Sequence, residues 1–271
     1  MMHNAFGMGP ALLFCPADRP ERYGKAMDRA DAVILDLEDA VAPEDRAQAR
    51  ESLVENPLDP ERTVVRVNAQ GTPDFDLDLA ALKKTEYSTI MVAKAEDPGA
   101  LADLVRYRVI ALCETAAGIL AAPRIAEVRN VVGLMWGAED LVASLGGTSS
   151  RHASGAYRDV ALHSRSRVLL AAGAFAKVAI DSVYLDFRDL DGLGEEARDA
   201  VASGFGAKAC IHPGQAETVR NAYQPTPDEA DYARRILAAA EGHGGVFQLD
   251  GRMVDGPVLR HAEATVRRVR P

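Results

Sequence analysis

Cysteine is scarce in this sequence: three residues, Cys15, Cys113 and Cys210, occur among 271. They lie far apart in apolar segments, and no two of them have the spacing of zinc ligands. An odd number of separated thiols also argues against a disulfide framework. We therefore expect reduced cysteines near the core of a cytoplasmic protein.

An excess of positive charge and long apolar runs are lacking too. The formal net charge is −9 and the pI is about 5.2, which disfavours nucleic acid as a partner because such binding needs a basic face. No apolar run reaches the roughly 18 residues of a membrane span, and residues 1–10 lack the basic and apolar segments of a signal peptide. We expect a cytoplasmic protein with neither nucleic acid nor membrane as a partner.

Several catalytic motifs are absent from the chain. It has no HExxH pair, no Walker phosphate loop and no GxSxG nucleophile elbow. The first apolar run ends in Cys15-Pro16-Ala17-Asp18 instead of a glycine-rich loop, which disfavours an open, doubly wound sheet. Gly204-Phe205-Gly206 precedes an apolar run instead of opening a helix, so we interpret it as a helix C-cap.

What the sequence does contain is a series of short apolar runs. Most are continuous and do not alternate, which is typical of strands buried on both faces. Helical stretches separate them, among them Pro43–Asn56, Ala116–Val128 and Asp159–Ala179. The predicted strands are Ala11–Ala17, Ala32–Glu38, Thr63–Asn68, Thr89–Ala93, Val109–Cys113, Val131–Trp136, Ser182–Phe187 and Ala207–His212.

Eight strand–helix units within about 220 residues favour an α/β fold, a (β/α)₈ or TIM barrel with an outer ring of helices. Beyond it, Asp228–Glu241 predicts a helix, Asp250-Gly251 predicts a two-residue hairpin turn, and Gly256–Val269 predicts a last helix. We place the catalytic barrel at residues 1–222. Residues 223–271 form a hairpin–helix extension that packs on the barrel or on a neighbouring subunit.

Two acidic residues follow neighbouring predicted strands. Glu114 comes directly after an apolar run and precedes small residues, and Asp140 lies in the segment Gly137-Ala138-Glu139-Asp140-Leu141. Barrel enzymes carry their working residues at the carboxyl ends of the strands. Each acid alone could be a helix N-cap or a surface charge, but together they suit Mg²⁺. The small Gly137 and Ala138 would let backbone N–H groups approach an anionic substrate.

Arg66 lies inside the apolar run Val64–Asn68 and must face solvent or find anions. At a barrel mouth it could clamp a carboxylate or stabilise an enolate oxygen. The alternative is a structural ion pair with Asp36, Glu38 or Asp39. We interpret these three acids as a supporting group that orients Arg66 or a metal-bound water.

Other candidate residues give weaker signals. Lys94 ends a predicted strand and could form a Schiff base. Asp186 and His212 also lie at predicted strand ends, although a lone histidine is more often structural. The polar segment Gly146–Tyr157 is either a mobile loop over the active site or a solvated connector.

Seven ordered motifs carry a family resemblance over nearly the whole chain. They are LLFCPADRPERYGKA, AVILDLEDAVAPEDRAQAR, VVRVNAQGT, ALCETAAGI, LMWGAEDL, KACIHPGQ and DGRMVDGPVLRHA. With them the chain resembles the citrate lyase β-subunit-like family, which includes malyl-CoA and citramalyl-CoA lyases. The resemblance implies a Mg²⁺-bound (β/α)₈ barrel, usually a homotrimer, with Mn²⁺ as a possible substitute metal.

The resemblance also implies roles for particular residues. Glu114 and Asp140 would be the metal ligands, and Arg66 would contact the substrate together with the segment Gly137–Glu139. Asp255 matches a catalytic acid/base that the family delivers from the tail of a neighbouring subunit. Three further residues match positions that contact coenzyme A in such lyases: Phe14, Arg19 and Lys25.

These features together predict a carbon–carbon lyase. It would cleave or form a 3-hydroxyacyl-CoA such as citramalyl-CoA, malyl-CoA or 3-hydroxy-3-methylglutaryl-CoA, through an acetyl-CoA enolate, with a 2-oxoacid as the other partner. Three alternatives stay open: a citrate lyase β subunit that uses an acyl carrier protein, a CoA-independent metal aldolase for small hydroxy-oxoacids, and an enolpyruvate phosphoryl-transfer barrel. The segment Gly146–Tyr157 carries no motif that identifies the acyl group.

Overall fold

The computed structural model describes residues 7–242 and 245–269. The chain divides into two compact units, Met1–Val219 and Arg220–Pro271. The first holds the parallel strands and the second holds the hairpin and the last helices.

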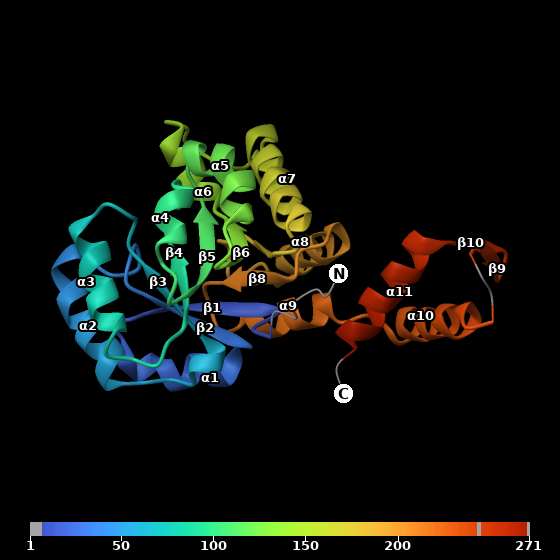
Figure 1. Ribbon diagram of the computed structural model, residues 1–271, viewed down its shortest axis with the longest axis horizontal. Coiled ribbons are helices and arrows are strands. Elements are labelled where there is room, and N and C mark those ends of the chain that lie inside the picture. Colours follow the sequence, from blue (N-terminus) through green and yellow to red (C-terminus); the bar gives the residue numbers. More distant parts are fainter. Residues whose placement is uncertain (1–6, 243–244, 270–271) are drawn as a thin grey trace. The chain divides into compact units, whose positions relative to one another are not determined.

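The first unit is a closed parallel barrel in which each strand pairs with the next and β1 pairs with β8 (Figure 1). This confirms the predicted (β/α)₈ fold. The strands are β1 (Ala11–Pro16), β2 (Ala32–Asp36), β3 (Thr63–Val67), β4 (Thr89–Val92), β5 (Arg108–Cys113), β6 (Val131–Trp136), β7 (Val178–Asp181) and β8 (Ala207–Cys210).

Helices follow the strands and cover the outside of the barrel, so the strands are apolar on both faces. Short polar side chains start several helices: the Thr72 and Thr115 hydroxyls accept from Phe75 N–H and Gly118 N–H. The α-helices of this unit are α1 (Tyr23–Arg29), α2 (Arg46–Glu55), α3 (Pro73–Leu82), α4 (Pro98–Ala102), α5 (Ala116–Glu127), α6 (Ala138–Ser144), α7 (Asp159–Ala174) and α8 (Leu190–Ser203). The next helix, α9 (Gln215–Tyr223), crosses the boundary between the two units. Single 3₁₀ turns are η1 (Pro20–Arg22), η2 (Pro43–Asp45) and η3 (Pro60–Arg62).

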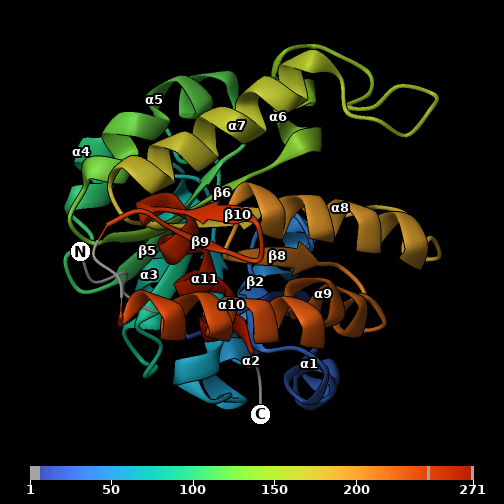
Figure 2. The same cartoon turned by 90° about the vertical axis from the view of Figure 1, so that its right-hand side faces the viewer.

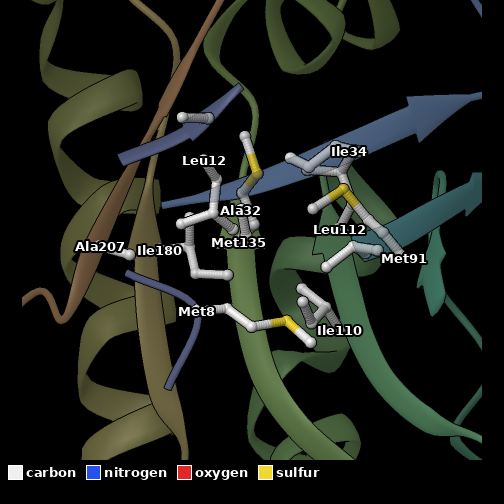
Figure 3. Packing of buried hydrophobic residues seen from close by; sticks show 12 residues of the cluster. Met8, Leu12, Ala32, Ile34, Met91, Ile110, Leu112, Met135, Ile180 and Ala207 are labelled. Carbon is white, nitrogen blue, oxygen red and sulfur yellow. The ribbon is translucent and has the colours of Figure 1, made fainter. Parts of the chain in front are cut away.

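Packed apolar side chains fill the barrel interior. Figure 3 shows Leu12, Ile34, Leu112 and Ile180, from four different strands, converging in one cluster. Met8 precedes β1 and packs into the same cluster, so it closes the barrel near the amino ends of the strands. In barrels of this kind the active site lies at the other end, where the strands finish.

The seventh strand was predicted in the wrong place. The apolar run Ser182–Phe187 is a loop, and the strand is Val178–Asp181. The preceding helix ends at Ala174, five residues before the predicted Ala179, because the chain turns through a left-handed residue, Ala176 (φ 54°). The true strand ends in a buried aspartate, which made it look less strand-like than the apolar run after it.

The predicted helix C-cap and the burial of the cysteines are confirmed. Gly204 is the left-handed C-cap of α8, with φ 112°. Cys15, Cys113 and Cys210, all within the described residues, are buried and form no disulfide bond. No helix among the described residues is long and apolar enough to cross a membrane.

The second unit contains α10 (Pro227–Ala240), the antiparallel strands β9 (Phe247–Leu249) and β10 (Arg252–Val254), and α11 (Gly256–Arg268). Asp250 and Gly251 both have positive φ, 50° and 76°, as the predicted two-residue turn requires. Ala233, Ile236, Val254 and Ala262 form a small core, and Figure 2 shows the hairpin that joins the two helices.

A buried ion network ties the seventh and eighth strands to the outer helices. Lys208, fully buried in β8, donates to Asp181 Oδ2 at 3.0 Å and to Glu196 Oε1 at 2.9 Å. Arg165 Nε and Trp136 Nε1 donate to the other Asp181 oxygen at 3.0 and 2.7 Å. Burial lowers the pKa of Lys208, but the two carboxylates outweigh it and raise the pKa, so the ammonium stays charged.

Replacing Lys208 by methionine should destabilise the barrel by about 3 kcal/mol, because it leaves buried carboxylates with fewer partners while keeping the side-chain volume. Urea unfolding of the full chain measures this. Arg22→Met is the control, since Arg22 pairs with Glu21 at 3.7 Å on the surface and should shift stability by less than about 0.5 kcal/mol. Equal stabilities of the two variants would contradict the role of the network.

Candidate active site

The strand alternation places four of the predicted site residues in one inward-facing layer. The buried residues Leu12, Ile34, Val64 and Leu112 point into the barrel core. Side chains two positions further along a strand share the same face. The layer one step nearer the carboxyl ends of the strands therefore holds Phe14, Asp36, Arg66 and Glu114.

Arg66 is buried and held by two carboxylates. Its Nε and Nη2 donate to the two oxygens of Asp36 at 2.7 and 2.6 Å, and its Nη1 lies 3.2 Å from Glu38 Oε2. Asp36 also accepts from the backbone N–H of Glu38 at 3.0 Å and of Ala40 at 3.1 Å. The guanidinium packs over the Phe14 ring, 4.8 Å from its centroid. Three contacts to two carboxylates give this arginine one fixed orientation.

Glu114 lies just beyond β5 with its side chain almost fully buried. Its Oε1 accepts from the backbone N–H of Lys94 at 3.1 Å. Burial, together with the nearby negative charge of Asp140, raises the pKa of Glu114 to about 8, against the opposing effect of Arg66 and Lys94. A carboxylate held in this way gains most from a cation placed between it and Asp140.

Asp140 lies in the first turn of α6, and its side chain is 39% exposed. The helix begins after Gly137, where a β-carbon would lie 2.8 Å from both the Cβ and the Oε2 of Glu114. A residue without a side chain is therefore needed to bring the start of α6 against Glu114. This close approach brings the start of the helix that carries Asp140 against Glu114, whose pKa the charge of Asp140 raises.

The two carboxylates fit a magnesium ion. Carboxylate oxygens are the donors that Mg²⁺ prefers, and it commonly takes one or two of them while keeping several water or substrate oxygens. Within residues 7–242 and 245–269, no group of three or more His, Cys, Asp or Glu side chains is arranged to hold a metal. A Mg²⁺ ion held by two carboxylates would keep positions for water or substrate oxygens.

Lys94 is the site residue whose position sequence reasoning missed. We considered its amine only as a Schiff-base nucleophile, but it forms ion pairs with Glu38 and with Asp39, the latter at 3.2 Å. Burial lowers the pKa of Lys94, and its carboxylate neighbours outweigh this and raise the pKa, which disfavours a neutral, nucleophilic amine. The only signal in the sequence was its place at a strand end.

The segment Gly146–Tyr157 forms the extended connection between α6 and α7 (Figure 2). Its buried Ser150 donates to Glu139 Oε1 at 2.5 Å. Near its end, the Tyr157 hydroxyl lies 3.1 Å from Glu196 Oε1 and the ring packs edge-on against Trp136. The loop is therefore tied at one point to the helix that carries Asp140 and at another to the buried ion network.

The remaining predicted residues lie in other loops and helices. Arg19 and Lys25, in the segment after β1, are exposed, and Arg19 Nε lies 3.2 Å from Asp18 Oδ2. Asp186 lies in the loop after β7, and His212 stacks on Phe187 with ring centroids 5.3 Å apart. Asp255 belongs to the second unit, where its carboxylate accepts from Val258 N–H at 3.2 Å and caps α11.

A family model described as HpcH/HpaI aldolase/citrate lyase matches residues 11–213, which include the whole barrel. The chain belongs to this family. Aldolases and citrate lyases both act on carbon–carbon bonds, so the HpcH/HpaI chain is a carbon–carbon lyase. The family assignment agrees with the resemblance carried by the seven sequence motifs.

Individual relatives of this HpcH/HpaI chain match nearly its full length. A citrate lyase subunit beta-like protein of Mycobacterium tuberculosis is 56% identical over 98% of this chain and 97% of its own. A mitochondrial citramalyl-CoA lyase of Homo sapiens is 31% identical over 97% of this chain and 86% of its own. The crystal structure of M. tuberculosis CitE in complex with magnesium, acetoacetate and coenzyme A superposes with a TM-score of 0.92 at 55% identity, covering 98% and 99% of the chains.

Gly137→Ala should reduce turnover at least tenfold, because the new methyl group would push Glu114 out of position. Steady-state kinetics of the purified variant at saturating metal measures this. Gly173→Ala is the matched control: no atom lies within 4 Å of the added methyl, and alanine favours the helix by up to about 1 kcal/mol. Equal activity of both variants would show that the close approach at Gly137 is unimportant.

Proposed function

We propose that this chain is a Mg²⁺-dependent lyase that cleaves or forms the carbon–carbon bond of a 3-hydroxyacyl-CoA. The observation that carries the proposal is the pairing of Glu114 and Asp140 at the carboxyl ends of the barrel strands, beside the fixed guanidinium of Arg66. The CitE structure, which contains magnesium, acetoacetate and coenzyme A, supports the same ligand classes here. Citramalyl-CoA, malyl-CoA and 3-hydroxy-3-methylglutaryl-CoA are the candidate substrates.

The cleavage we propose starts from the substrate's 3-hydroxyl group. Mg²⁺, held by Glu114 and Asp140, would polarise that hydroxyl and the neighbouring carboxylate. The hydroxyl gives its proton to a water molecule, the carbon–carbon bond breaks, and the bonding electrons move into the thioester. The products are the enolate of acetyl-CoA and a 2-oxoacid, or acetoacetate when the substrate is 3-hydroxy-3-methylglutaryl-CoA. In the synthetic direction the same enolate attacks the keto carbon of the 2-oxoacid.

Residues of the chain would stabilise and protonate this enolate. Arg66 donates to the enolate oxygen from an orientation that Asp36 and Glu38 fix in advance. Backbone N–H groups at Gly137 and Ala138, with Glu139 beside them, contact the 2-oxoacid. Asp255, delivered by the tail of a neighbouring subunit, gives a proton to the enolate carbon. Phe14, Arg19 and Lys25 contact coenzyme A.

A panel of thioesters tests this function. Malyl-, citramalyl-, 3-hydroxy-3-methylglutaryl- and citryl-CoA are each incubated with Mg²⁺, and acetyl-CoA and the 2-oxoacid or acetoacetate are quantified. We expect equimolar acetyl-CoA and its co-product from at least one substrate, with loss of activity by more than about a thousandfold in Asp140→Ala. Release of free CoA alone, or full turnover of Asp140→Ala without metal, would contradict the mechanism.

The same panel separates the alternatives. Saturation by a free hydroxy-oxoacid, with no gain from its thioester, would identify a CoA-independent metal aldolase. Activity that appears only when an acyl carrier protein carries the thioester would identify a citrate lyase β subunit. The 56% identity to a citrate lyase subunit beta-like protein makes the carrier-protein arm necessary.

Mixing two inactive variants tests whether Asp255 works from a neighbouring subunit. Asp255→Asn and Asp140→Ala should each be nearly inactive, and Asp255→Asn should still bind the thioester. After dissociation and reassembly together, sites that combine an intact Asp140 with a neighbour's intact Asp255 should restore about a quarter of the activity, provided mixing is random. No recovery in mixed oligomers would place Asp255 in its own subunit's site or outside the reaction.

A further inference from the structure

Lys94 has a backbone conformation that a lysine seldom adopts. Its φ is 48°, in the left-handed region, just after the end of β4. Such a conformation costs a non-glycine residue free energy that glycine would avoid. In this conformation its backbone N–H points at Glu114 Oε1, 3.1 Å away. The backbone of Lys94 thus holds one metal carboxylate, a task that glycine could perform with less strain.

The reason for a lysine at this position must therefore lie in its side chain. Its ammonium forms ion pairs with Glu38 and Asp39 and lies 4.0 Å from Asp140 Oδ1, the other metal carboxylate. The side chain is only 32% exposed, so solvent screens these charges incompletely. One residue therefore contacts both carboxylates of the metal site, through its backbone on one side and its ammonium on the other.

Charge at the mouth of the barrel is strongly unbalanced. Five carboxylates contact Arg66 or Lys94, which gives this group a formal charge of minus three when all are ionised; they are Asp36, Glu38, Asp39, Glu114 and Asp140. A bound divalent cation leaves minus one. Without Lys94 the value would be minus two, and an anionic 2-oxoacid would enter against a stronger repulsion.

We propose that Lys94 is a positioning residue that also offsets the carboxylates of the metal site, so that an anionic 2-oxoacid can bind beside the metal. The proposal rests on the function proposed above. It makes a specific demand: removing the ammonium strengthens binding of the cation and weakens binding of the anion. A purely structural role would weaken both.

The test uses the full chain and measures binding rather than turnover. Mn²⁺ affinity is followed by the loss of the free-ion electron paramagnetic resonance signal, and pyruvate affinity by calorimetry at saturating Mn²⁺. For Lys94→Met we expect Mn²⁺ binding to tighten about fivefold and pyruvate binding to weaken about tenfold, as a charge at this distance implies. Lys94→Arg keeps the cation and should show less than half of each effect on a logarithmic scale.

Two further variants keep the test decisive. Lys94→Gly removes the ammonium but relieves the left-handed backbone, so it should fold and show the same opposite shifts as Lys94→Met. Lys84→Met removes an exposed lysine outside the site and should change neither affinity. Unchanged or weaker Mn²⁺ binding in Lys94→Met and Lys94→Gly, or unchanged pyruvate binding, would overturn the proposal. Wild-type protein that binds no Mn²⁺ would overturn the proposed function as well, which separates the two failures.

Discussion

The arrangement of the other charged side chains in the site depends on one buried guanidinium. Arg66 lies on a strand inside the barrel, where an unpaired charge would be very costly, and Asp36 meets it with two parallel hydrogen bonds. That requirement brings Glu38 inward as a further partner, and Glu38 in turn pairs with Lys94. Lys94 then contacts both Glu114 and Asp140. A chain of alternating charges thus connects β2, β3, β4, β5 and α6 around one end of the barrel.

Much of this arrangement was predictable from the residues alone. The strand alternation and the carboxyl-end rule suffice to put Glu114, Asp140 and Arg66 at one end of the barrel. The two acids follow apolar runs, and the arginine lies near the end of one. The role of Lys94 was not predictable, because its left-handed backbone donates a hydrogen bond to Glu114, twenty positions away in the chain. The seventh strand was misplaced for a related reason: Asp181 is tolerated in a strand only because Lys208 and Arg165 neutralise it from other elements.

The site is asymmetric in how firmly its parts are held. Arg66, Asp36 and Glu114 are buried, whereas Asp140 and Lys94 are partly exposed. The buried members can act as a fixed frame, and the exposed members face the space where substrate and metal would arrive. Asp255, which we propose as the acid/base, belongs to the second compact unit, where it caps α11.

The hydrogen bond between Ser150 and Glu139 has a consequence for how this lineage can change its substrate. Glu139 precedes Asp140 on the same helical turn, so altering the loop that carries Ser150 also disturbs the residue next to Asp140. Loop sequences from relatives with other substrates would then not be freely interchangeable. Divergence of this loop would proceed by paired changes, one in the loop and one at position 139. A grafted loop lacking the second change would lose the contact that ties it to α6.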